Sequence, residues 1–156
     1  MQEAGHFNSV RQGYNTDVVL SAPKLALRKI TFNSADGTQL VANQTWRFNL
    51  SSPLYNVVFV DWGLINNINN GNTGGNGACL MRIDEIPSYG ITSSGQGYFA
   101  ALVGGTTQNL LMSPKPPVKY NPLSISQLTF TLFAGANSFS QTQAWSIELY
   151  FYIEDS

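Results

Sequence analysis

Apolar and polar side chains alternate strictly in the segment Gln143–Glu154, which reads QAWSIELYFYIE. Trp145, Ile147, Leu149, Phe151 and Ile153 fall on one side of an extended strand, and the residues between them fall on the other. A period of two over about ten residues, rich in aromatic and β-branched types, predicts a β-strand with one buried face. An exposed strand of this length would template aggregation, so we expect it to be paired within a sheet.

Several other segments also have patterns that predict β-strands. Residues 25–33 and 39–50 have strand-like patterns and are joined by Asp36-Gly37, a strong hairpin signal. Residues 54–65 form a mostly apolar strand, and in 124–133 the pattern turns Leu128, Phe130 and Leu132 inward. No segment has the spacing of an amphipathic helix. About eight strands separated by turn signals predict an all-β fold, a single eight-stranded jelly-roll sandwich.

The first 24 residues differ from the rest, because they have few spaced apolar residues and several turn formers. We expect an extended N-terminal arm over residues 1–24 and one jelly-roll domain over residues 25–156. The run Val18, Val19 and Leu20 favours an arm that docks on another surface over a disordered terminus. These three residues are candidate interaction residues.

Charged residues are scarce, at 11% of the 156 residues, and the net charge is −1. An average soluble domain has roughly 25%. A neutral polar surface with many aromatic residues suits a protein that contacts other proteins over much of its area, since charge keeps proteins apart. Basic residues are not clustered, so we expect no direct nucleic-acid binding.

One cysteine cannot form an internal disulfide, the N-terminus has no apolar signal-peptide core, and no apolar run reaches 18 residues. These features predict synthesis in a reducing cytoplasm and no membrane span.

Candidate catalytic and metal-binding groups are few. The single histidine, His6, lies in the arm, and Cys79 is expected to be a small buried apolar group. Arg82 and Asp84 are expected to form a surface ion pair, and Asp61 a structural pair with Arg47 on a neighbouring strand. The sequence therefore predicts no enzyme, no cofactor and no metal site.

Aromatic residues offer one alternative, because sugars stack on exposed aromatic rings. Trp46 and Trp145 share a strand face with apolar residues and are expected in the core. Trp62 and Tyr98 remain as possible ligand-facing aromatics. They support the alternative of a carbohydrate-binding, lectin-like attachment module with a jelly-roll fold.

The arrangement of the C-terminal half carries a resemblance. Pro122 precedes Leu128-Thr129-Phe130-Thr131-Leu132, Gly135 follows, and Trp145-Ser146-Ile147-Glu148-Leu149 forms the last strand. This order resembles the ending of single jelly-roll capsid proteins of large icosahedral double-stranded DNA viruses. The upstream segments RFNLSSPLYNVVFVDWGLI and LMRIDEIPSYGITSSGQGYFAAL look like earlier strands of such a domain, so the resemblance covers roughly residues 40–154.

The resemblance implies a structural virion protein, either a penton at the five-fold vertex or a minor capsid protein. It implies contacts with other capsid proteins and a homo-oligomer, with a pentamer favoured. Tyr150 and Tyr152, on the outward side of the last strand, are further candidate interaction residues. A second alternative, a receptor-binding cytokine-like trimer, is opposed by the missing signal peptide and disulfide.

Overall fold

The structure is a computed structural model that describes residues 24–68, 77–104, 110–111, 119–134 and 139–155. Except for one 3-10 turn, η1 (Ser34–Asp36), all the regular structure in these residues is β-strand. The strands are β1 (Leu25–Asn33), β2 (Thr38–Val41), β3 (Thr45–Asn66), β4 (Gly77–Ile83), β5 (Gly90–Ile91), β6 (Gly97–Tyr98), β7 (Ala100–Gly104), β8 (Leu110–Leu111), β9 (Leu123–Phe133) and β10 (Ser146–Glu154). The prediction of an all-β fold is confirmed.

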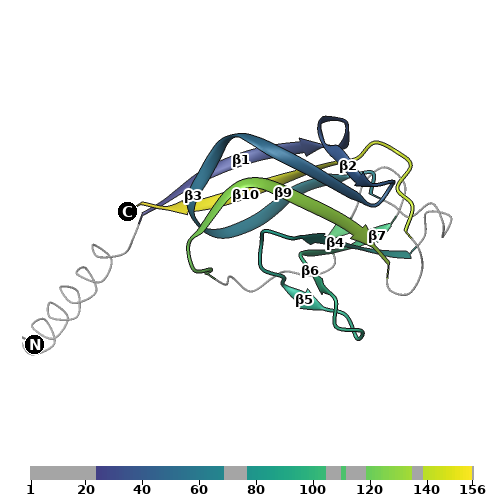
Figure 1. Ribbon diagram of the computed structural model, residues 1–156. Helices are drawn as coiled ribbons and strands as arrows, with labels where there is room; N and C mark the ends of the chain where they lie inside the picture. The colour runs from purple at the N-terminus through teal and green to yellow at the C-terminus, as the bar shows by residue number, and fades with distance from the viewer. Residues whose placement is uncertain (1–23, 69–76, 105–109, 112–118, 135–138, 156) are drawn as a thin grey trace, which may run out of the picture.

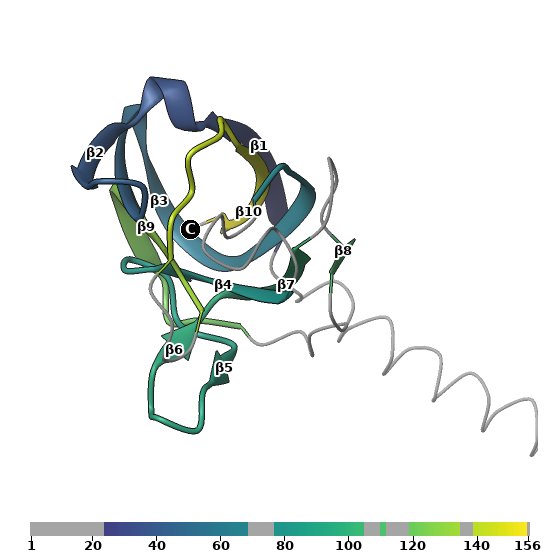
Figure 2. The same ribbon diagram turned by 90° about the vertical axis from the view of Figure 1, so that its right-hand side faces the viewer.

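Eight strands form one curled antiparallel sheet in the order β1-β10-β3-β9-β4-β7-β8, with β2 also paired to β3 (Figure 1). The second half of β3 pairs with β10, and its first half pairs with β2 and β9. The sheet therefore curls into two layers joined by β3, and Figure 2 shows the strands around a common interior. This arrangement is consistent with the predicted jelly-roll sandwich. β5 and β6 form a separate two-stranded sheet.

β3 is 22 residues long and runs through both layers, and its pairing is irregular near the middle, where it passes from one layer to the other. Its register against β9 shifts between Asn49 and Leu54 and again between Leu54 and Val57. Pro53, which has no N–H to donate, lies in the first shift, and Asn56 has a φ of 57° in the second. Extra residues of this kind bend a strand and increase its twist.

The predicted hairpin at Asp36-Gly37 is wrong. β1 pairs with β10 along its whole length, and β2 instead forms a hairpin with β3 through a turn in which Asn43 has a φ of 60°. Gly37 has a φ of −96°, so it does not form the primed turn on which the hairpin signal depends. The η1 turn is tied to the start of β10, since the Ser34 N–H donates to the Trp145 carbonyl at 2.9 Å.

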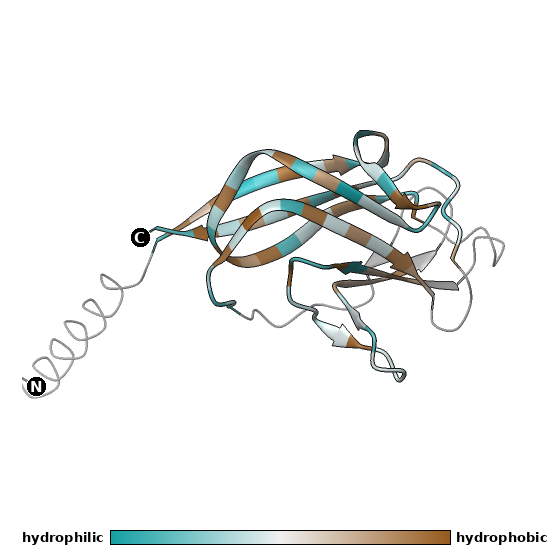
Figure 3. Cartoon of the chain, viewed as in Figure 1, coloured by the Kyte–Doolittle hydropathy of each residue, from teal (hydrophilic) through white to brown (hydrophobic). Residues whose placement is uncertain are grey.

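The core confirms the alternation predicted for the last strand. Ile147, Leu149 and Phe151 are fully buried, whereas Tyr150 and Tyr152 are only partly covered. Figure 3 shows the same alternation of hydrophobic and hydrophilic residues along the strands. Trp46 and Trp145 are also in the core, as predicted, with ring centroids 5.3 Å apart.

Phe130 on β9 packs the two layers together. Its ring centroid lies 5.3 Å from Phe32 on β1, 5.3 Å from Phe48 on β3 and 5.8 Å from Trp145. These rings meet edge to face or tilted, the geometries that aromatic pairs prefer. The sandwich is therefore held by an aromatic cluster that joins strands distant in sequence.

Three smaller predictions have mixed outcomes. Cys79 is buried in the core, and Arg82 pairs with Asp84 at 3.0 Å, both as predicted. The expected placement of Arg47 beside Asp61 on a neighbouring strand is wrong, because both residues belong to β3. Asp61 instead accepts a hydrogen bond from the backbone N–H of Trp62 at 2.8 Å.

Candidate interaction surface

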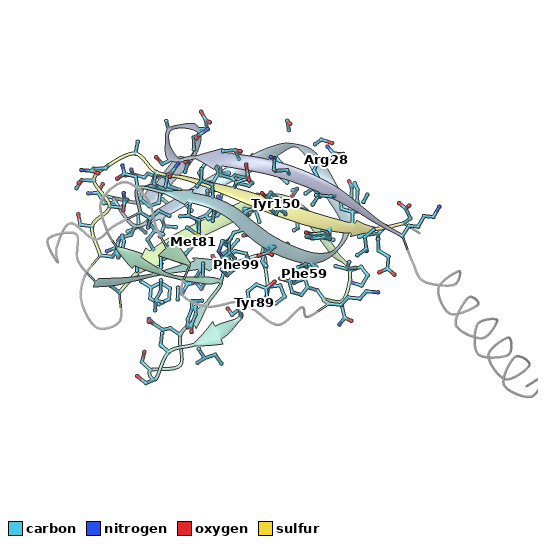
Figure 4. The ribbon with its side chains drawn as sticks, turned by 180° about the vertical axis from the view of Figure 1, so that it is seen from behind. Arg28, Phe59, Met81, Tyr89, Phe99 and Tyr150 are labelled. Atoms are coloured by element: carbon cyan, nitrogen blue, oxygen red, sulfur yellow. The ribbon has the colours of Figure 1, made fainter. Side chains whose placement is uncertain are left out.

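The layer formed by β1, β10 and the second half of β3 has an outward side that we call the outer face. Tyr150 and Tyr152, predicted as interaction residues, both lie on it. Tyr150 is opposite Lys29 on β1 and Asp61 on β3, and Tyr152 is opposite Leu27 and Phe59. Figure 4 shows Tyr150 and Phe59 on neighbouring strands of this layer. The register thus places the two tyrosines in the central strand of one surface.

One part of the outer face is polar and contains the ion pair between Lys29 and Glu148. The Tyr150 hydroxyl donates to Glu148 Oε1 at 2.6 Å, and Lys29 Nζ lies 3.6 Å from Glu148 Oε2. The two β10 side chains lie over Gly63, where a Cβ atom would come within 2.6 Å of the Tyr150 hydroxyl. The hydrogen bond to the Glu148 carboxylate raises the pKa of Tyr150. The result is a polar surface on which Lys29, Glu148 and Tyr150 are linked to one another.

The other part of the outer face is apolar. Leu25 and Leu27 of β1 have 53% and 58% of their surface exposed. Tyr152 and Phe59 are half-buried, with ring centroids 5.4 Å apart. Large apolar groups gathered on one exposed surface are typical of protein contacts.

The free edge of the second half of β3 is covered by a pair of tyrosines. The Tyr89 hydroxyl lies 2.6 Å from both the Val60 carbonyl, to which it donates, and the Tyr120 hydroxyl. Each hydroxyl has one proton, so Tyr120 donates to Tyr89. The backbone N–H of Tyr120 also donates to the Val58 carbonyl at 2.7 Å. These bonds give hydrogen-bond partners to the Val58 and Val60 carbonyls on this edge of β3, next to the outer face. They also hold the β5–β6 region against the edge.

Removing one hydroxyl tests this tyrosine pair. Tyr89→Phe is expected to lower the free energy of unfolding by about 1–2 kcal/mol, because it leaves the partly buried Val60 carbonyl and Tyr120 hydroxyl without their partner. Urea denaturation measures the loss. Tyr55→Phe is the matched control, since Tyr55 is 61% exposed, and is expected to change stability very little. Equal losses in the two variants would contradict the assignment.

The same pair predicts a loss of stability at high pH. Burial raises the pKa of Tyr89 and that of Tyr120. The unfolded chain releases these protons near pH 10, and the folded chain only at a higher pH. Their contribution is therefore complete below about pH 10 and is lost as the pH rises toward the folded values.

Denaturation between about pH 9 and pH 11 measures this effect. The free energy of unfolding of the wild type is expected to fall over this range, and the Tyr89→Phe/Tyr120→Phe double variant is expected to fall less steeply. The same slope in both proteins would rule out the tyrosine pair as the cause.

The aromatic residues proposed to face a ligand do not form a common sugar site. Trp62 is 7% exposed and its ring packs in the interior against Phe99, with centroids 5.0 Å apart. Its faces are therefore covered. Tyr98 is half-buried on β6, where its ring lies against Gly90 of β5. The structure does not bring the two residues to one exposed surface.

Other predicted features fall outside this surface. Val18, Val19, Leu20 and His6 lie outside the described residues. Within the part of the chain that the structure describes, no group of three or more His, Cys, Asp or Glu residues could hold a metal ion. Nor do these residues include a helix whose length and apolar character would allow it to cross a membrane.

The sequence did not identify Leu25, Leu27 and Phe59 as members of the outer face. The alternation of Leu25, Leu27 and Lys29 with Arg28 and Ile30 was a usable signal. Which residues of the neighbouring strand lie beside Leu25 and Leu27, however, depends on the register of β1 with β10. That register pairs residues more than 100 positions apart in the sequence.

We compared the chain with protein-family models and with curated proteins, and neither comparison found a match.

Proposed function

We propose that this protein is a structural subunit of a virus capsid. In this proposal the jelly-roll domain sits at the five-fold vertex as a penton, or in a minor capsid position, of a large icosahedral double-stranded DNA virus. It binds copies of itself and other capsid proteins. It is synthesised in the host cytoplasm and incorporated into the virion. The resemblance of residues 40–154 to single jelly-roll capsid proteins motivates the viral part of this proposal.

The outer face is the observation that carries the structural role. It combines exposed leucines, half-buried aromatic rings and charges that are already paired, as in Lys29–Glu148 and Lys119–Glu154. Paired charges lower the cost of burying such a surface against a neighbour, because neither charge is left alone when water is removed. A rigid sheet with such a face suits repeated contacts between identical copies.

Closed rings place specific demands on a subunit. In a five-fold ring each copy presents one surface to a different surface of the next copy, so every contact is heterologous. The scarcity of charge reduces repulsion between identical copies brought together in this way. A pentamer built on the outer face is the assembly that we favour.

The proposal is tested on intact virus particles from the source of this chain. We expect protein mass spectrometry to detect the chain in purified particles, and a cryo-EM reconstruction to contain the curled sheet at five-fold or minor capsid positions. Absence of the chain from the particles would exclude the proposal.

A further inference from the structure

The curled sheet does not close between β1 and the first half of β3, and a groove of about 380 Å³ lies there. β1 ends the strand order, so its second edge has no strand partner among the described residues. β2 covers β3 only at Thr45–Arg47, so the groove opens beyond that point. Its lining comes from residues 28–33 of β1, Asp36, and Phe48–Ser52 and Leu54 of β3.

The groove has an apolar floor and a charged rim. Phe32, Phe48 and Leu54 are buried, and Ile30 and Leu50 are half-buried beside them. Arg28 falls on the same side of β1 as Ile30 and Phe32, yet it is exposed, because the sandwich is open at this point. Figure 4 shows Arg28 on this strand.

These features fit an extended peptide. The free edge of β1 offers unpaired backbone N–H and C=O groups, which an additional strand satisfies by β-augmentation. An apolar floor receives every second side chain of such a strand. Arg28 has no ion-pair partner among the described residues, so it favours an occupant that carries a carboxylate.

We propose that the occupant is the segment Tyr14–Leu20 of a neighbouring copy of this chain, added as a strand beside β1. The segment reads YNTDVVL, and in a strand Asn15, Asp17 and Val19 share one side. With this side toward the groove, Asp17 would meet Arg28 and Val19 would face the apolar floor. Twenty-three residues precede Lys24, enough to span up to about 75 Å when extended. This inference rests on the proposed function and names where the arm of one subunit binds the next.

Two observations favour the arm of a neighbour over the subunit's own arm. The Lys24 carbonyl accepts a hydrogen bond from the Asp155 N–H at 3.1 Å, which fixes the start of β1. Pro23 comes immediately before it. The two-residue hairpin turns that would fold the arm straight back along β1 require a positive φ, which proline does not adopt.

The test uses the full-length chain at low and high concentration. Analytical ultracentrifugation measures association, and hydrogen–deuterium exchange measures protection of the β1 amides at residues 28–33. Arg28→Glu is expected to weaken association at least about ten-fold and to remove the concentration-dependent protection. Arg47→Glu, the same charge change at an exposed β3 residue outside the groove, is expected to do neither. Adding Asp17→Arg to Arg28→Glu is expected to restore both.

Three results would overturn the inference. Equal behaviour of Arg28→Glu and Arg47→Glu would exclude the groove as the binding site while leaving the capsid proposal in place. Protection of β1 that does not depend on concentration would assign the groove to the subunit's own arm. If the particles contained the chain only as isolated copies that do not contact one another, this inference would be overturned. The chain would still be a virion protein, so the proposed function would stand.

Discussion

Replacing Phe130 by alanine is expected to lower the free energy of unfolding by about 3–5 kcal/mol, the range for truncating a buried aromatic residue. Phe130 has no exposed surface, and its ring contacts Phe32, Phe48 and Trp145. These neighbours come from both layers, so they cannot all move inward to fill the cavity. Denaturation by guanidinium chloride measures the loss.

Phe133→Ala is the matched control. Phe133 lies on the same strand, but it is only half-buried and Arg82 lies over its ring. We expect a loss of no more than about 1 kcal/mol, because little buried surface is removed. If Phe133→Ala destabilised the protein as much as Phe130→Ala, the aromatic cluster would not be what holds the two layers together.

Leu27→Asp is expected to weaken self-association about ten-fold or more while leaving the fold intact. Leu27 is in the apolar part of the outer face, opposite Tyr152, and it is 58% exposed in the single chain. A charge at this position costs little in water, but it is unfavourable when a neighbour covers the surface. Sedimentation velocity over a concentration series measures the change.

Leu40→Asp controls for the general effect of replacing an exposed leucine by a charge. Leu40 is 44% exposed on β2, which pairs only with the first half of β3 and is not part of the outer face. We expect its association to match that of the wild type. If both variants associated as the wild type does, the outer face would not be the contact between copies.

The sequence predicted the local features of the fold well. The alternation in β10 correctly identified Ile147, Leu149 and Phe151 as core residues and Tyr150 and Tyr152 as outward residues. These predictions succeeded because a strand with one buried face imposes its own period on the sequence.

Pairing between distant strands could not be predicted in the same way. Asp36-Gly37 looked like a hairpin turn, but β1 pairs with β10 because that register buries Phe32 against Phe48 and Phe130. Trp62 looked available to a ligand, and it is buried because Tyr89 and Phe99 pack against it. Both outcomes depend on contacts between segments far apart in the chain, which a local pattern does not encode.

The sequence identified only some residues of the outer face, for the same reason. Tyr150 and Tyr152 were identified from alternation, whereas Leu27 and Phe59 join them only through the registers of β1 and β3 with β10. The groove beside Arg28 is a property of the sheet as a whole, since it exists where the curled sheet fails to close.

The most direct test of the central proposal, a structural subunit that assembles with its own copies, is the mass of the purified full-length protein. Native mass spectrometry is expected to detect a closed homo-oligomer, with a pentamer favoured, in place of the 17.1 kDa chain alone. A protein that remains a 17.1 kDa monomer at every concentration would contradict the account.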